Sequence, residues 1–196
     1  MRKVIPEDAI LIPDGAVCAF RGRIFSVYQW PQEMYDGSIE TFEMLKRDDA
    51  AVALCIVDGK ILIQTEEQPH SNTRVNFPGG HVDPEDENTL AAAQREVFEE
   101  TGYTFRDWRL IKVWQTYGKS ENFVYLYMAW GMESQSEPIE QPGERITVQA
   151  LSFDEVKQKV YAREGYLGDD IDLFEKVSNI EEVLQFPEYK GVLVDR

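Results

Sequence analysis

The sequence predicts an α+β fold in which helices pack on a mixed sheet, with a small antiparallel β unit at the N-terminus. Two apolar, β-rich segments flank the pair Asp58-Gly59, and one amphipathic helical pattern begins near residue 88. Further strand patterns follow, and the last patterns are helical. This order of strands, one helix, strands and then helices describes a mixed sheet with helices packed on it.

The N-terminal region contains three segments rich in β-formers, separated by turn signals at Arg21-Gly22 and Asp36-Gly37. These segments are residues 17–20, 23–30 and 38–46. We therefore expect residues 1–47 to form an N-terminal β region and residues 48–196 to form the main domain.

The main domain is expected to begin with a hairpin. Residues 50–57 and 60–64 flank Asp58-Gly59, a strong two-residue turn signal, and their nearly continuous hydrophobicity suggests a sheet covered on both faces. Later strands are expected at residues 108–116, 123–130 and 146–151. Residues 133–143 are polar with two prolines, so we expect a surface loop there.

Three helices are expected. The clearest spans residues 88–101, with Asp86 or Asn88 as its N-terminal cap and Gly102 at its end. Ser152 and Glu155 form a capping-box pattern for a second helix that ends near Tyr161. The third is expected over residues 170–184.

The composition narrows the classes of partner. The formal charge of −16 argues against nucleic acid, whose binders present Lys and Arg surfaces. No stretch approaches the ~20 apolar residues of a membrane span, and Met1-Arg2-Lys3 is not followed by an apolar segment, so we expect a cytoplasmic protein. Cys18 and Cys55 have no ligand motif nearby and are expected to pack in the core.

The helix over residues 88–101 contains the strongest chemical signal. Glu96, Glu99 and Glu100 stand at positions i, i+3 and i+4, so three carboxylates share one face and repel each other. Arg95 precedes Glu99 by four residues and is expected to hold that carboxylate, leaving Glu96 and Glu100 freer. A solvated helix face is the ordinary alternative. A divalent cation would instead turn the repulsion into attraction, because Mg²⁺ prefers oxygen ligands.

The residues around the acidic helix face favour the metal-binding interpretation. A pattern Arg-Glu-x-x-Glu-Glu-x-Gly arises by chance at roughly one position in a million. Pro78-Gly79-Gly80 also precedes the helix, and a glycine pair lets the backbone approach a ligand closely.

These residues resemble the signature of the Nudix hydrolase family, whose second half is intact from Arg95 to Tyr103. The first half has one additional residue between Gly80 and the helix, which leaves the partner of Arg95 open among Asp83, Asp86 and Glu87. The resemblance implies an α/β/α sandwich and Mg²⁺, with Mn²⁺ as an alternative. It also implies metal binding by Glu96 and Glu100, helped by Glu99 and the Gly79 carbonyl.

The resemblance further implies that Arg95, Glu96 and Glu99 take part in catalysis, together with a base from an acidic loop at residues 133–144. Glu137, Glu140 and Glu144 are the candidate bases, and Glu144 is preferred because it abuts a strand that would position it.

The N-terminal region is similar to the ADP-ribose and nucleotide-sugar pyrophosphatase branch of the family. The similar segments are Gly22-Arg23-Ile24-Phe25, Asp36-Gly37, Thr41-Phe42-Glu43, Arg47-Asp48 and Glu67-Gln68-Pro69. This similarity implies a homodimer formed by the N-terminal strands. Tyr28 and Trp30 are candidates for stacking on the base, with ordinary strand packing as the alternative. The other candidate substrate-binding residues are Arg47, Arg74 and Gly80.

The implied reaction cleaves the pyrophosphate linkage of a small nucleoside diphosphate derivative, giving a nucleoside monophosphate and a phosphorylated moiety. Two alternatives stay open: hydrolysis of nucleoside triphosphates, and a non-catalytic Nudix module that senses a nucleotide.

Overall fold

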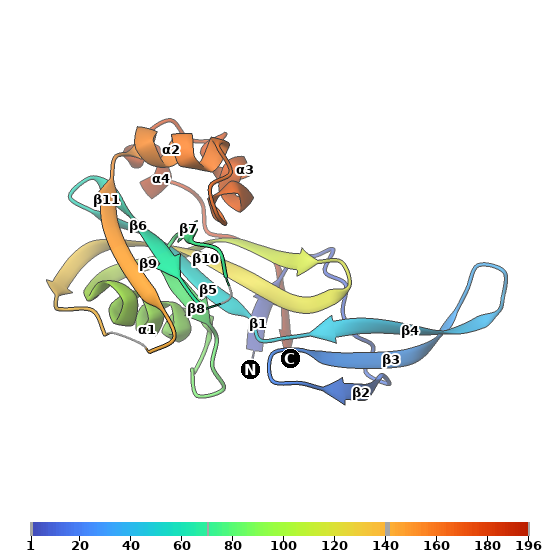
Figure 1. Cartoon of the computed structure of the whole chain (residues 1–196). Helices are drawn as coiled ribbons and strands as arrows, with labels where there is room; N and C mark the ends of the chain where they lie inside the picture. Colours follow the sequence, from blue (N-terminus) through green and yellow to red (C-terminus); the bar gives the residue numbers. More distant parts are fainter. Residues whose placement is uncertain (1, 70, 140–141, 196) are drawn as a thin grey trace.

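The computed structural model describes residues 2–69, 71–139 and 142–195. A ten-stranded mixed sheet forms its centre, and a separate two-stranded sheet joins the two ends of the chain (Figure 1). The strand order along the main path of the large sheet is β11-β6-β5-β10-β4-β3-β2.

An antiparallel wing extends away from the body of the molecule (Figure 1). It consists of β2 (Val17–Arg21), β3 (Ser26–Glu33) and β4 (Ile39–Lys46). The expected N-terminal β unit is thus confirmed, although β3 begins three residues later than predicted. The wing is not detached, because β4 pairs in parallel with the start of β10 (Ser120–Gln135).

The centre of the sheet is the hairpin of β5 (Ala50–Val57) and β6 (Lys60–Glu67). Asp58 and Gly59 both have positive φ, at 49° and 72°, as a tight hairpin turn requires. On its other side β5 pairs in parallel with β10, which in turn pairs with β9 (Tyr103–Tyr117). Three further strands complete this region: β7 (Arg74–Asn76) and β11 (Arg145–Leu151), which pair with β6, and β8 (Gly79–His81), which pairs with β5.

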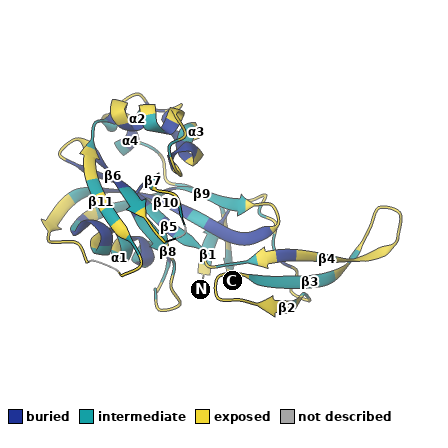
Figure 2. Ribbon diagram, viewed as in Figure 1, coloured by how far each residue is buried: buried dark blue, intermediate teal, exposed yellow. Residues whose placement is uncertain are grey.

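Helices cover both faces of this central sheet. On one face α1 (Thr89–Thr101) packs Ala92, Ala93 and Val97 against the small side chains of β5. On the other, α2 (Phe153–Tyr161) packs Val156 and Val160 against the alternate residues of the same strands. The buried stretches of β5, β6 and β10 lie between these layers (Figure 2). The predicted α/β/α sandwich on a mixed sheet is therefore confirmed.

The prediction of one helix over residues 170–184 is wrong. The segment divides into a 3-10 turn, η1 (Leu167–Asp170), followed by α3 (Ile171–Phe174) and α4 (Ile180–Leu184). The break falls before Asn179, whose side chain accepts a hydrogen bond from the Glu182 amide and so starts a new helix.

The strand β10 also runs further than expected. It continues through Gln135 into the segment predicted to be a loop, because Ser134 and Gln135 pair with the start of β9. The remainder, up to the last described residue before the gap at 140–141, is exposed and irregular.

The two ends of the chain pair with each other, a pairing that no local sequence pattern predicts. β1 (Arg2–Ile5) is antiparallel to β12 (Val192–Asp195). Lys3 anchors β1 to the start of β5 through an ion pair with Asp49, at 2.6 Å and largely buried. The division of the chain between residues 47 and 48 stays a prediction.

The two cysteines agree with the expectation of core packing in part. Cys18 and Cys55 are both free thiols; Cys55 is buried in the core as predicted, whereas Cys18 is half-buried on β2. None of the helices in the described ranges has the length and apolar character that crossing a membrane requires.

Gly102 supports a first prediction about stability. It ends α1 with φ at 74°, and a Cβ there would lie 2.0 Å from the Ser136 carbonyl oxygen. We expect Gly102→Ala to lower the free energy of unfolding by about 2 kcal/mol or more, because it adds both backbone strain and a backbone clash. Urea denaturation measures this loss.

The matched control is Gly15→Ala, where a Cβ would meet nothing within 4 Å. It should change the free energy of unfolding by less than about 0.5 kcal/mol. Equal effects of the two substitutions would show that Gly102 has no special role.

Candidate active site

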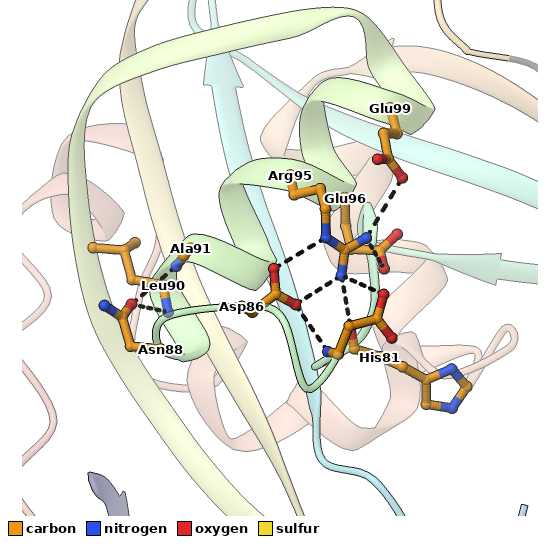
Figure 3. Close-up of polar contacts among 9 residues, drawn as sticks. His81, Asp86, Asn88, Leu90, Ala91, Arg95, Glu96 and Glu99 are labelled. Atoms are coloured by element: carbon orange, nitrogen blue, oxygen red, sulfur yellow. Dashed lines mark hydrogen bonds and ion pairs between the residues drawn. The ribbon is translucent and has the colours of Figure 1, made fainter. Parts of the chain in front are cut away.

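The helix α1 begins at a side-chain cap. The Asn88 carboxamide oxygen accepts hydrogen bonds from the amides of Leu90 and Ala91, both at 3.0 Å (Figure 3). Of the two candidate caps, Asn88 is therefore the one used. The cap fixes where α1 starts, and so it fixes which residues face the loop before the helix.

Arg95 takes Asp86 as its main partner (Figure 3). The two form a bidentate pair, with Nε 3.1 Å from Oδ1 and Nη2 2.9 Å from Oδ2. Asp83 is a more distant partner at 3.4 Å, and Glu87 forms no hydrogen bond or ion pair with Arg95 within the described residues. The guanidinium beside Asp86 holds the pKa of that carboxyl below its usual range.

The additional residue in the loop before α1 is absorbed by a turn. The Asp86 amide donates to the Asp83 carbonyl at 3.1 Å, and the Asp83 amide donates to the Asp86 carboxylate at 2.8 Å. The turn leaves Asp86 facing Arg95, so the longer loop keeps the ion pair.

Arg95 also contacts the helix carboxylates, in a different order from the one predicted. Its Nη1 lies 2.9 Å from Glu96 Oε1 but 3.5 Å from Glu99 Oε2. Glu96, rather than Glu99, is thus the carboxylate that Arg95 holds most closely. Burial nevertheless raises the pKa of Glu96, against the lowering effect of Arg95, and the charges of Glu99 and Asp83 add to the rise.

The glycine pair of β8 lies directly against these carboxylates. A Cβ on Gly80 would lie 2.7 Å from the Glu96 carboxyl carbon, so glycine is required for the carboxylate to lie there. Gly79 has φ at 143°, and a Cβ there would lie 2.3 Å from the Ala51 carbonyl oxygen. Gly79 is therefore needed for the close approach of β8 to β5, whereas Gly80 leaves the space that the Glu96 carboxylate occupies.

Glu100 is the most buried carboxylate of the helix, with 7% of its surface exposed. Its Oε2 accepts a 2.6 Å hydrogen bond from the Gly79 amide, and its Oε1 accepts one of 3.0 Å from Gln64 Nε2. Burial raises the pKa of Glu100 to about 8, and the charges of Glu96 and Glu144 contribute to this rise, while the two hydrogen bonds oppose it.

A second set of polar residues lies on β6 and β7 and was not among the site residues predicted from the sequence. Glu66 accepts hydrogen bonds from Gln68 at 2.5 Å and from Asn76 at 2.9 Å. Gln64 is fully buried and pairs in register with Asn76. The available signal was Gln64 itself, a polar residue within the apolar run of β6, with Glu66 two residues later on the same face.

Glu144, the preferred base, lies beside this polar set, immediately before β11. Its Oε2 accepts a hydrogen bond from Gln68 at 3.2 Å, and its charge raises the pKa of both Glu66 and Glu100. Glu137 follows Ser136. The Ser136 amide donates a hydrogen bond to the carbonyl of Gly102, which is the C-terminal cap of α1. Glu140 lies outside the described residues.

The other predicted site residues separate into two groups. Arg47 lies close to the loop before α1, with Nη2 2.7 Å from His81 Nε2, and Arg74 lies on β7 opposite Glu66. Tyr28 and Trp30 instead lie on β3 of the wing, away from α1 (Figure 1). There the Trp30 ring packs 5.3 Å from Phe42, centroid to centroid.

The donor set fits a cation that keeps water or substrate ligands. Within the described residues, no three His, Cys, Asp or Glu side chains are placed to enclose a metal ion by themselves. Mg²⁺ seldom needs such a cage, since it is usually bound by one or two carboxylates with waters and phosphates. The buried carbonyl oxygen of Gln64, beside Glu100, also has no hydrogen-bond partner, which suits a site that gains a ligand.

The raised pKa of Glu100 predicts how stability depends on pH. A carboxyl whose pKa is higher in the folded state contributes stability below its unfolded pKa, near 4.5, and that stability is lost as pH rises through about 8. In metal-free protein, Glu100→Gln should therefore be more stable than the wild type at pH 8, by about 3 to 4 kcal/mol, and similar to it at pH 4.5.

Thermal unfolding in EDTA at both pH values measures the difference. The control is Glu137→Gln, an exposed carboxylate for which the difference between pH values should be small. If the difference in stability between Glu100→Gln and the wild type were the same at both pH values, this titration could not be assigned to Glu100.

Comparison with known proteins shows the family and the fold of the chain. The NUDIX domain model matches residues 46–169, whereas no curated protein matches the chain. A solved structure titled as an ADP compounds hydrolase is similar at 19% identity, with a TM-score of 0.62, covering 76% of this chain and 81% of that one. A MutT NUDIX hydrolase from Burkholderia pseudomallei has 21% identity and a TM-score of 0.45, covering 55% and 84%. The first likeness concerns the fold, and the family model covers most of the chain. The chain belongs to the Nudix family.

Proposed function

We propose that this protein is a Mg²⁺-dependent pyrophosphohydrolase acting on a nucleoside diphosphate derivative, either ADP-ribose or a nucleotide sugar. The observation that carries the proposal is the placement of Glu96 and Glu100 against the glycine pair of β8, with Glu144, immediately before β11, close enough for its charge to raise the pKa of Glu100. Mutual repulsion of buried carboxylates is costly for folding alone and becomes useful when a cation is bound. The solved relative described as a hydrolase of ADP compounds supports the substrate class.

Glu96 and Glu100 would hold the Mg²⁺, with help from Glu99 and the Gly79 carbonyl; Mn²⁺ is an alternative ion. When bound, the ion neutralises charge on the phosphate oxygens as the linkage breaks. Arg95 positions Glu96 through the 2.9 Å contact, and Asp86 in turn fixes Arg95. Gly80 leaves the space in which the Glu96 carboxylate lies.

Glu144 would act as the base. A water oxygen attacks one phosphorus, the bond from that phosphorus to the bridging oxygen breaks, and the water proton passes to the carboxylate. The products are a nucleoside monophosphate and a phosphorylated moiety. Glu144 suits this role because it is half-buried and close enough to Glu100 for their charges to interact. Among the described residues, one long hydrogen bond holds it, from Gln68.

We propose further that the wing forms a homodimer. Four apolar side chains of the wing are each more than half exposed: Val17, Phe20, Ile24 and Ile39. The edge strand β2 is also unpaired on one side, within the described residues. Apolar edges of this kind favour pairing with another chain. A second copy would also bring Tyr28 and Trp30 to a site, since the wing of one chain extends away from its own α1 (Figure 1).

Hydrolysis of a substrate panel tests the proposed reaction. With Mg²⁺, the wild type should hydrolyse ADP-ribose or a nucleotide sugar, and Glu96→Gln should lower kcat at least 100-fold because it removes a proposed metal ligand. Phosphatase-coupled release of phosphate measures both. Activity on deoxynucleoside triphosphates alone would favour the triphosphate alternative, and binding without turnover would favour a sensing module.

In the same assay Glu144→Gln should lower kcat about 100-fold or more, with little change in KM, because general-base catalysis contributes roughly that factor. Glu137→Gln is the matched control from the same acidic segment and should retain full activity. A wild-type rate for Glu144→Gln would assign the base elsewhere.

Light scattering after size exclusion tests the dimer. The wild type should be dimeric at micromolar concentration, and Phe20→Asp should be monomeric because it places a charge on the exposed apolar edge. Ile10→Asp alters a similarly exposed apolar residue outside the wing and should leave the dimer intact. A monomeric wild type would contradict the proposal.

A further inference from the structure

Within the described residues, Arg74 is a cation without an ion-pair partner, beside a cluster of carboxylates. It lies directly opposite Glu66 in the register of β6 and β7, where an ion pair would be easy to form. Glu66 instead accepts hydrogen bonds from Gln68 and Asn76. Throughout the described ranges, the Arg74 guanidinium has no hydrogen bond and no ion pair within 4 Å, although its charge lowers the pKa of Glu66.

The Arg74 guanidinium lies over an aromatic ring instead. Its central carbon lies 5.1 Å from the centroid of the Tyr166 ring, within the range of a cation–π interaction. Tyr166 comes from the segment between α2 and η1, far along the chain from β7. Tyr166 is 55% exposed, so this contact lies at the surface and is open to a ligand.

The backbone of the Tyr166 segment is fixed against β7. The Tyr166 amide donates to the Val75 carbonyl at 3.2 Å. Gly165 precedes it with φ at 54°, and a Cβ there would lie 2.2 Å from the Val75 carbonyl oxygen and 2.5 Å from its amide nitrogen. Only glycine allows this approach, so the position of the Tyr166 ring under Arg74 is determined by the backbone.

This arrangement has a consequence for anion binding. A guanidinium that formed an ion pair with Glu66 would be neutralised, and its N–H groups would be occupied. The contact with the Tyr166 ring holds the guanidinium in place without occupying its N–H groups. A fork of N–H donors held in this way matches the oxygens of a phosphate, at a lower entropic cost than a mobile side chain.

The site is strongly negative, so a second cation would help it to bind an anionic substrate. A diphosphate substrate carries two anionic groups into a site that contains Glu66, Glu96, Glu100 and Glu144, on a chain of formal charge −16. A cation bound at Glu96 and Glu100 would offset the phosphate nearest α1. The other phosphate would face Glu66 and Glu144, and Arg74 is a cation on that side, opposite Glu66.

We propose that Arg74 binds the substrate phosphate that is remote from α1, and that Tyr166 is a positioning residue that keeps Arg74 away from Glu66 and ready for that phosphate. The segment of Gly165 and Tyr166 would thereby form part of the substrate site. This inference rests on the proposed pyrophosphohydrolase function and adds to it the residues that recognise the second phosphate.

Binding of ADP in the presence of Mg²⁺, measured by isothermal titration calorimetry, tests the proposal. Arg74→Met should weaken binding at least about tenfold, because a charge-assisted contact is lost. Arg74→Lys should give an intermediate loss, since it keeps the charge but not the fork. Tyr166→Leu should weaken binding about threefold to tenfold, and Tyr166→Phe, which keeps the ring, should bind like the wild type.

Kinetics with the substrate identified from the panel give a second readout. The Arg74 and Tyr166 variants should raise KM more than they lower kcat, and thermal unfolding should show that they remain folded. Tyr117→Leu removes another exposed tyrosine, at the end of β9, and should change neither quantity.

These measurements distinguish a failure of the Arg74 inference from a failure of the proposed function. If the wild type hydrolyses the panel substrate but Arg74→Met binds ADP as tightly as the wild type, this inference is wrong and the proposed function stands. If the wild type neither hydrolyses any panel member nor binds ADP, the proposed function fails and this inference fails with it. Loss of binding on Tyr166→Phe equal to that on Tyr166→Leu would overturn the positioning role of the ring.

Discussion

The bidentate pair of Arg95 and Asp86 is the interaction on which the rest of the site depends. It joins the loop before α1 to the middle of that helix, and the same guanidinium reaches the His81 carbonyl at 3.0 Å and Glu96 at 2.9 Å. One cation thus connects β8, the loop and the acidic face of α1. Because the carboxylates around it repel each other, removing this cation would both loosen the loop and release Glu96.

The parts of the fold that were predicted correctly depend on local interactions. The Asp58-Gly59 turn, the Asn88 cap, the Gly102 helix end and the Ser152–Glu155 capping box each involve residues within a few positions of one another. The acidic face of α1 was also visible, since helical spacing alone brings its glutamates together. The broken helix near Asn179 was misjudged because a polar cap within an otherwise helical pattern looks like an ordinary surface residue.

The parts that were missed depend on contacts between distant segments. The pairing of β1 with β12 joins opposite ends of the chain, and no local sequence pattern predicts it. Gln64 and Asn76 become part of the site only through the register of β6 with β7, and Tyr166 only through its approach to Val75. The partner of Arg95 could be predicted in part. The spacing limited it to Asp83, Asp86 and Glu87, but only the turn between Asp83 and Asp86 shows that Asp86 faces Arg95.

We expect the repelling carboxylates of α1 to form a cation site before any substrate arrives. Titration of substrate-free protein with Mn²⁺, following the free ion by electron paramagnetic resonance, measures this binding. The wild type should bind Mn²⁺, Glu96→Gln should bind it at least about tenfold more weakly, and Glu137→Gln should bind it like the wild type. Equal affinity of the wild type and Glu96→Gln for Mn²⁺ would contradict the claim.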